Sequence, residues 1–228
     1  MIKTIFFLTI CCVNVYSQFD TLWVRTINGT SNNYDGSLAS ATDNSGNVYA
    51  CGVIVNSSTN TDMQVAKYSS SGVLLWSRTY NGTANAFDAA NGIAVDLLGN
   101  VYVTGGANYT SGFDMVTIKY NPSGDTVWVR RYNGNQNIGD EANTIALDSA
   151  GNIYVAGYST NAGNSSDATV LKYSPAGVLL FAKSFNSGPN QPDSWLDVKV
   201  DNSFNIYLAG YAGSTNGGNN FLIMKLNS

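Results

Sequence analysis

Short runs of branched and aromatic residues alternate with small or polar residues along the chain, and polar clusters separate the runs. In the second quarter of the chain and just beyond it, this pattern predicts strands at 92–95, 101–104, 114–120 and 126–130. The segments 96–100 and 121–124 are rich in Asp, Asn, Pro and Gly, which favours tight turns. Segment 105–113 is typical of a looser connection. We therefore expect units of four antiparallel strands without helices.

A four-residue phrase returns at a fixed period. Gly-Asn-Val-Tyr at 46–49 recurs at 99–102, as Gly-Asn-Ile-Tyr at 151–154 and as Phe-Asn-Ile-Tyr at 204–207. The asparagines of the four phrases are 53, 52 and 53 residues apart: Asn47, Asn100, Asn152 and Asn205. A period of this length is typical of stacked or radially arranged repeats. The sequence therefore predicts an all-β fold, a four-bladed β-propeller with four-stranded antiparallel blades.

The two ends of the chain look complementary. The fourth unit reaches only its third strand, whereas Trp-Val-Arg at 23–25 matches the fourth-strand phrases Trp-Ser-Arg at 76–78 and Trp-Val-Arg at 128–130. We expect this N-terminal strand to complete the last blade and close the ring. The propeller domain then spans 18–228, with repeats at 35–82, 88–134, 140–186, and 193–228 plus 20–28. The alternative is a larger ring that another copy of the chain completes.

The first residues resemble an export signal. Lys3 precedes an apolar stretch, and Val-Tyr-Ser at 15–17 is a small-residue cleavage site, so we expect a signal peptide at 1–17 and a secreted or cell-surface protein. Without it the chain keeps 10 cations against 15 acids, a net charge of −5. Sparse charge without a basic stripe argues against nucleic acid, and no other segment is apolar enough for membrane insertion. Cys51 then has no disulfide partner, and we interpret it as a small buried side chain.

The phrases at 93–105 and 145–157, Ile-Ala-Val-Asp-Leu-Leu-Gly-Asn-Val-Tyr-Val-Thr-Gly and Ile-Ala-Leu-Asp-Ser-Ala-Gly-Asn-Ile-Tyr-Val-Ala-Gly, resemble bacterial SBBP-type β-propeller repeats. The resemblance covers essentially the whole chain after the signal peptide. It implies a secreted or surface protein, and it implies no known catalytic residues. Such propellers are commonly built from seven blades, so a count of four departs from the family pattern.

Little in the chain points to catalysis. Histidine is absent and Glu141 is the single glutamate, which removes the commonest general base. Most aspartates, lysines and arginines recur once per repeat, as structural hydrogen-bonding residues do. Asp197 and Lys199 break the pattern on the first strand of the last blade, where they form either a local ion pair or a ligand-orienting pair near the axis. We expect no cofactor and no metal site, with calcium left open.

Loops supply the better candidates for binding. The connections between second and third strands and between blades are predicted to be long and to emerge on one face, where variable loops commonly bind ligands. This long-loop face carries aromatic residues beside paired Asn and Asp residues. Rings and amides together suit carbohydrate or peptide ligands. The candidate ligand-binding residues are Asn32, Asp35, Asn85, Asp88, Asn137, Asp140, Asn190, Asp193, Asp197 and Lys199.

The sequence thus favours an exported, non-enzymatic propeller for extracellular binding or adhesion, with a carbohydrate or protein ligand. Two alternatives stay open: an enzyme acting on polysaccharide with a central site, and a structural ring that assembles with other surface proteins. We expect a monomer rather than a homo-oligomer.

Overall fold

The computed structural model describes residues 20–31, 33–57, 60–134, 138–160 and 165–227. These residues form four antiparallel sheets, in which the strands follow the order of the chain. The first sheet contains β1 (Gly36–Thr42), β2 (Val48–Ser57), β3 (Asn60–Tyr68) and β4 (Leu74–Tyr80). The second contains β5 (Ala89–Val95), β6 (Val101–Tyr109), β7 (Gly112–Tyr120) and β8 (Thr126–Tyr132). The third contains β9 (Asp140–Leu147), β10 (Ile153–Thr160), β11 (Ser166–Tyr173) and β12 (Leu179–Phe185). The fourth contains β13 (Asp193–Val200), β14 (Ile206–Gly213) and β15 (Asn219–Leu226).

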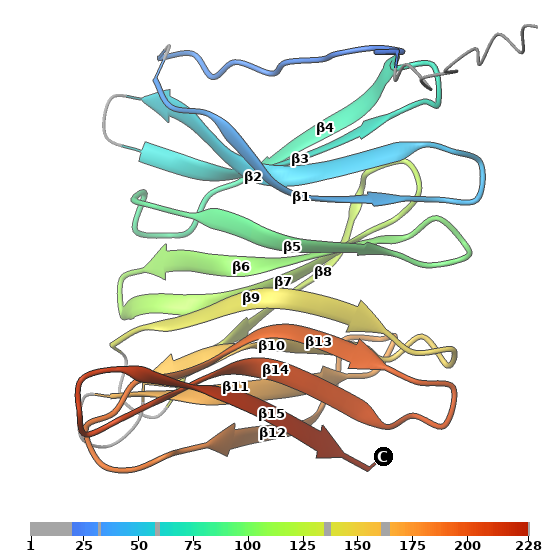
Figure 1. The fold of residues 1–228 in the computed structure, drawn as a ribbon. Helices are drawn as coiled ribbons and strands as arrows, with labels where there is room; N and C mark the ends of the chain where they lie inside the picture. Colours follow the sequence, from blue (N-terminus) through green and yellow to red (C-terminus); the bar gives the residue numbers. More distant parts are fainter. Residues whose placement is uncertain (1–19, 32, 58–59, 135–137, 161–164, 228) are drawn as a thin grey trace, which may run out of the picture.

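The sheets stack face to face in chain order, with the first at the top of Figure 1 and the fourth at the bottom. Their first strands, β1, β5, β9 and β13, pack against one another in succession, so each sheet meets the next along a shared inner edge. This arrangement is all-β and propeller-like, as the repeat predicts.

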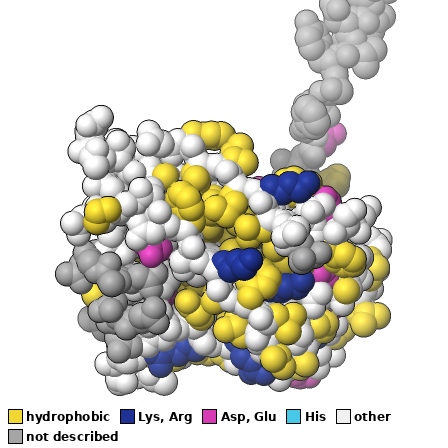
Figure 2. Space-filling model, turned by 90° about the horizontal axis from the view of Figure 1, so that it is seen from below, with side chains coloured by type: hydrophobic (Ala, Val, Ile, Leu, Met, Phe, Trp, Pro, Cys, Tyr) yellow, Lys and Arg dark blue, Asp and Glu magenta, His cyan; other side chains and the backbone are white. Residues whose placement is uncertain are grey.

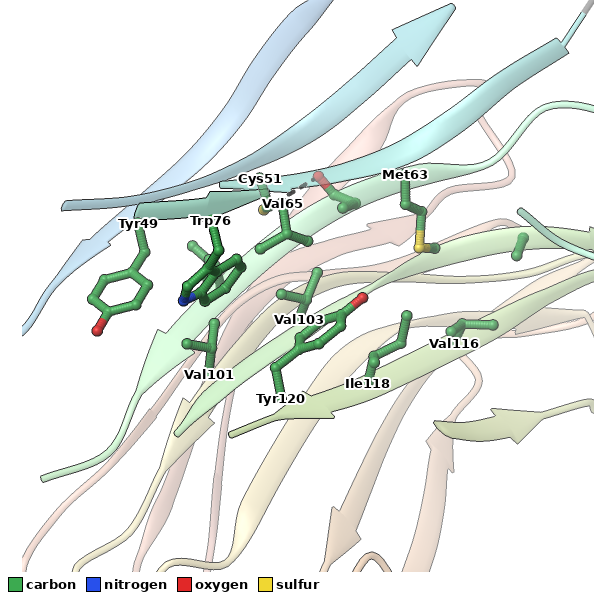
Figure 3. Packing of buried hydrophobic residues seen from close by; sticks show 13 residues of the cluster. Tyr49, Cys51, Met63, Val65, Trp76, Val101, Val103, Val116, Ile118 and Tyr120 are labelled. Atoms are coloured by element: carbon green, nitrogen blue, oxygen red, sulfur yellow. Dashed lines mark hydrogen bonds between the residues drawn. The ribbon is translucent and has the colours of Figure 1, made fainter. Parts of the chain in front are cut away.

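Apolar side chains fill each seam, by which we mean the space between two consecutive sheets. In the first seam, Met63, Val65 and Trp76 of the first sheet pack on Val103, Ile118 and other buried residues of the second (Figure 3). The Trp76 ring lies 6.1 Å from that of Tyr120. Two further clusters occupy the second and third seams. The core is therefore divided among seams, and each one is closed by burying apolar surface.

A repeated side-chain clamp forms the turn between the first and second strands of every sheet. In the second sheet, Asp96 Oδ1 accepts hydrogen bonds from the backbone amides of Leu98 and Asn100. Its Oδ2 accepts from the Asn100 side chain at 2.8 Å and from the Tyr102 hydroxyl at 3.1 Å. The same contacts recur around the equivalent aspartates of the other sheets, Asp43, Asp148 and Asp201. The predicted structural role of this aspartate column is confirmed.

The predicted closure of the ring is not present among the described residues. β15 pairs with β14 only, so the fourth sheet has three strands and the described part of the chain has fifteen rather than sixteen. Residues 21–25 form no strand and lie on the first sheet, where the Trp23 indole donates to the Ser70 carbonyl at 3.1 Å. Figure 1 places this segment and β15 at opposite ends of the stack. The sequence match predicted a strand paired with β15, whereas the structure shows a segment without strand pairing that packs on the first sheet.

The connections between second and third strands are shorter than predicted. β6 extends to Tyr109 and β7 starts at Gly112, because most of the predicted loop at 105–113 pairs as strand. Gly105 permits this extension, since a Cβ there would clash with the Ala89 carbonyl across the β5–β6 bulge. The long loops are therefore the connections between sheets. They meet the hairpins between second and third strands, as the Ala84 amide bonded to the Asn108 carbonyl shows, so the predicted common face is confirmed.

Candidate functional site

The loop aspartates predicted as ligand-binding residues are bound to their own loops. Asp88 is buried, and its carboxylate accepts from the backbone amides of Gly82 at 2.6 Å and Asn108 at 2.7 Å. Asp35, Asp140 and Asp193 make the equivalent contacts in the other sheets. Each of these carboxylates joins the backbone of the loop that precedes its sheet to the backbone near the end of the neighbouring second strand. These four residues position the loops of the face.

The loop asparagines divide into two described and two undescribed positions. Asn32 and Asn137 lie outside the described residues. Asn85 and Asn190 are exposed and have positive φ angles of 51° and 60°, which asparagine tolerates better than most residues. The Asn85 side-chain oxygen accepts from Asn60 at 2.8 Å and from Asn81 at 2.7 Å, so it links two loops of the face.

The off-repeat pair Asp197 and Lys199 forms a local ion pair on β13, with Nζ 2.7 Å from Oδ1. Both side chains are exposed to solvent, where such a pair has a small effect on stability. Neither residue lines the groove described next.

A groove opens on the long-loop face at the first seam. Its cavity is about 450 Å³ and is lined by residues of the first three sheets and their loops: Asn33, Tyr34, Leu38, Val53, Val55, Asn60, Thr61, Phe87, Ala89, Asn91 and Glu141. The Tyr34 and Phe87 side chains are 71% and 51% exposed. The Phe87 ring rests on the Phe113 ring, with centroids 6.3 Å apart, which fixes its position. We call this cavity the seam groove.

The polar end of the seam groove is built around Glu141 on β9. The Asn91 side-chain amide donates to Glu141 Oε1 at 2.9 Å and to the Ala142 carbonyl at 3.0 Å. The Tyr158 hydroxyl donates to Oε2 at 3.1 Å. Burial raises the pKa of Tyr158, and the adjacent Glu141 carboxylate raises it further, so the hydroxyl stays protonated and holds this carboxylate.

A comparison of Asn91 with its equivalents in the other sheets explains why the groove lies at the first seam. It joins β5 to β9, and Asn143 joins β9 to β13 in the same way, donating to the Trp195 carbonyl at 2.7 Å. The equivalent position of β1 is Leu38, three residues after the loop aspartate of its repeat. Leucine cannot donate a hydrogen bond, so no such link ties β1 to β5. The inner edge of the first seam is left apolar and open.

One buried polar atom on the groove wall lacks a partner. The Asn60 side chain is only 6% exposed, its amide nitrogen donates to Asn85, and its Oδ1 makes no hydrogen bond in the structure. Leaving a buried acceptor unpaired costs on the order of 1–3 kcal/mol, and this oxygen lies beneath the surface of the groove rather than on it.

The groove contains one carboxylate, amide groups and aromatic surface. Glycoside hydrolysis commonly requires a pair of carboxyl groups across the scissile bond, whereas Glu141 is the one acid that lines this cavity. The arrangement can hold a ligand by stacking and hydrogen bonding. Across the described residues, no group of three or more acidic or cysteine side chains lies close enough to hold a metal ion. No helix in that part of the chain could cross a membrane.

Sequence reasoning identified some of these residues and missed others. Tyr34 and Phe87 stand out as aromatic residues in the loops, and Glu141 as a charge that breaks the repeat. Leu38, Asn60 and Asn91 carry no such mark, because each looks ordinary in its own strand. Comparing Leu38 with Asn91 and Asn143 across the repeats is the signal that could have found the open seam.

The chain has detectable relatives. It is 26% identical to a WD repeat-containing protein of Acanthamoeba polyphaga mimivirus over 67% of this chain and 14% of that protein. It is 29% identical to the regulatory protein FlaEY of Caulobacter vibrioides over 62% of this chain and 17% of that protein. The chain thus spans less than a fifth of the length of these two relatives.

Among solved structures, an endo-arabinanase from Bacillus licheniformis aligns with a TM-score of 0.39 at 15% identity, over 82% of this chain and 71% of that one. A mannose phosphorylase from Leishmania mexicana aligns with a TM-score of 0.41 at 13% identity, over 81% and 65%. At TM-scores below 0.5 these likenesses carry no inference about the chemistry of this chain.

The family comparison is more specific. Residues 78–111 and 127–163 each match the model of the SBBP β-propeller repeat. These segments contain the turn clamps at Asp96 and Asp148, and they include the phrases at 93–105 and 145–157 from which the resemblance was predicted. The chain therefore carries SBBP β-propeller repeats, matched in its second and third sheets.

Proposed function

We propose that this chain is an exported, non-enzymatic protein that binds an extracellular carbohydrate in the seam groove. The observation that carries the proposal is the groove itself, which exposed Tyr34 and Phe87 rings line together with Glu141. Its volume of about 450 Å³ falls within the range of small-molecule sites, roughly 300–1,000 Å³.

A sugar matches the two halves of this groove. The aromatic rings offer flat apolar surface to the C–H face of a pyranose, and Phe87 is held in place by Phe113. Hydroxyl groups of the sugar can donate to the Glu141 carboxylate, which has lone pairs beyond those used by Asn91 and Tyr158. An extracellular location is expected from the predicted signal peptide at 1–17.

A glycan array followed by calorimetric titration tests the proposal. We expect a neutral or basic oligosaccharide to bind, and Phe87→Ala and Glu141→Gln each to weaken that binding by about tenfold or more, a loss of about 1.4 kcal/mol. Leu196→Ala is the matched control, because Leu196 is exposed at the position of Leu38 but in the fourth sheet.

Two results would contradict the proposal. Binding that survives Phe87→Ala and Glu141→Gln but is lost in Leu196→Ala would place the ligand elsewhere. Release of shorter saccharides during incubation with the purified chain would make the protein an enzyme.

A further inference from the structure

The fourth sheet exposes a face that the other three sheets bury. Phe221 and Ile223 on β15 are 85% and 65% exposed. Their pairing partners Tyr211 and Ala209 correspond to Val53 and Cys51 in the first sheet, where the residues opposite are the buried Met63 and Val65. Figure 2 views the molecule from the side of the fourth sheet and shows hydrophobic side chains gathered there among Lys and Arg. This face therefore has the apolar composition of the faces that are buried in a seam, but no described sheet covers it.

The N-terminal segment makes the contacts of a fourth strand from a preceding sheet. The Trp23 indole donates to the Ser70 carbonyl at 3.1 Å, and Arg25 Nε donates to the Gly72 carbonyl at 2.6 Å. Trp128 and Arg130 of β8 contact the corresponding turn of the third sheet in the same way, at 3.3 Å and 2.6 Å. In contrast to β8, the segment at 21–25 has no strand beside it among the described residues.

A cavity of about 260 Å³ lies between this segment and the first sheet. It is lined by Arg25 of the segment, by Ile27 just after it, and by residues of the sheet that include Ala50, Gly52, Ala66 and Tyr68. In the second sheet the equivalent positions are Val103, Gly105, Ile118 and Tyr120, three of which pack against Met63, Val65 and Trp76. The cavity thus corresponds to the space that third-strand side chains of the preceding sheet, such as Met63 and Val65, fill in the first seam (Figure 3).

We propose that a second copy of this chain supplies the missing neighbour, so that residues 21–25 of one copy pair with β15 of the other. The register follows from β7 and β8, where Trp128 pairs with Lys119 and Val129 with Ile118. Transferred to the ends, it pairs Trp23 with Lys225 and Val24 with Met224. Phe221 and Ile223 of one copy then fill the cavity of the other, and β15 gains a partner through strand addition.

A second copy fits better than the same chain because three seams separate the two complementary surfaces in Figure 1. An interface between different surfaces of identical chains is the head-to-tail type. The internal seams predict one more contact. Lys67 and Lys119 each donate to a turn carbonyl of the following sheet, so Lys225 would donate to the Ser70 carbonyl of the second copy. The proposal does not depend on the seam groove, which lies between the first and second sheets.

Cysteine pairing tests the interface. In chains whose three native cysteines are replaced, Val24→Cys and Met224→Cys are made separately, purified, mixed and oxidised. We expect a disulfide-linked species of twice the chain mass in the mixture and in neither variant alone. Directly opposed residues of neighbouring strands place their Cβ atoms about 4.5–5.5 Å apart, close to disulfide range.

The control is Ala66→Cys with Ser77→Cys in one chain, since these residues pair between β3 and β4 at the same register. This control should form a disulfide at the mass of a single chain. A single-chain disulfide in the double variant of Val24 and Met224, without linked dimers in the mixture, would overturn the proposal in favour of closure within one chain. A mixture that stays unlinked and has the solution mass of one chain would also overturn it.

Discussion

The first and second seams differ at their inner edges and agree at their outer edges. At the outer edge, Trp76 donates to the Pro122 carbonyl at 3.1 Å, and Trp128 donates to the Pro175 carbonyl at 3.3 Å. At the inner edge, Asn91 links β5 to β9 across the second seam, whereas Leu38 occupies the equivalent place in the first.

This difference shows how a repeat fold can keep its packing and still open a groove at one seam. The tryptophan contact and the apolar cluster hold the outer part of each seam. The inner asparagine is therefore not required in every seam, and where it is replaced the seam groove appears.

Removing a seam tryptophan should have the largest effect on stability. Trp76→Ala and Trp128→Ala each lose a large buried ring and a hydrogen bond, so we expect the free energy of unfolding to fall by about 3–5 kcal/mol. Trp23→Ala should cost only about 1 kcal/mol, because Trp23 is half-buried and packs on one sheet. Urea denaturation measures all three, and equal losses would mean that the N-terminal segment is integrated as fully as a strand.

Changing a loop aspartate should have the next largest effect. Asp140 accepts hydrogen bonds from the Gly134 amide at 2.6 Å and the Thr160 amide at 3.1 Å. Asp140→Asn replaces one of the two accepting oxygens by an NH₂ group, which cannot accept a hydrogen bond from a backbone amide. We therefore expect the unfolding free energy to fall by about 1–3 kcal/mol. Asp197→Asn, which breaks an exposed ion pair, should change stability by less than about 1 kcal/mol. A smaller loss of stability for Asp140→Asn than for Asp197→Asn would contradict the structural role that we assign to the loop aspartates.

Exchanging the inner-edge residues should separate stability from binding. Asn91→Leu removes the link across the second seam and leaves the Ala142 carbonyl without its donor, for a loss of about 1–2 kcal/mol. Leu38→Asn can donate to the Ala90 carbonyl and should leave stability within about 0.5 kcal/mol, since Leu38 is exposed. It should nevertheless weaken saccharide binding by narrowing the groove. Unchanged saccharide binding in Leu38→Asn would contradict the proposal that the ligand binds at the first seam.

The smallest effect concerns the turn clamps, which are common to all four sheets. The Asn205 side chain, with the Asn205 and Ser203 amides and the Tyr207 hydroxyl, lowers the pKa of Asp201 to about 2. Because this pKa is lower in the folded state than in the unfolded state, the ionised carboxylate stabilises the fold at pH values above the unfolded pKa. That stabilisation is lost as the pH falls towards about 2. NMR titration should show Asn205→Ala moving this pKa back towards 3.8. A pKa that does not move would mean that the clamp contacts are not maintained in solution.

The sequence predicted the features that depend on contacts within one repeat. Asp96, Asn100 and Tyr102 lie within seven residues, and their spacing alone placed the turn, the strands around it and the repeat. Strand length was predicted less well, because Gly105 and its polar neighbours looked like a loop when read without their partner strand. Pairing across the hairpin supplied hydrogen bonds that extended both strands.

Features that depend on contacts between repeats were harder to predict. The Trp-x-Arg pattern at 23–25 predicted a fourth strand, but it specifies the turn on which Trp23 packs and not an edge with which the segment pairs. The seam groove brings Tyr34 and Phe87, from the loops before β1 and β5, together with Glu141 of β9, and we relate its place to the leucine at position 38 where other repeats have asparagine. Such a contrast becomes visible once the inner strands are known to touch.

Hydrogen–deuterium exchange with and without the best-binding oligosaccharide tests the central claim, that the first seam is the binding site, most directly. We predict slower exchange at 33–38 and 87–91, which line the open seam, and little change at 193–199 in the fourth sheet. Protection centred on Asp197 and Lys199, or on the turn clamps at the opposite end of the sheets, would contradict it.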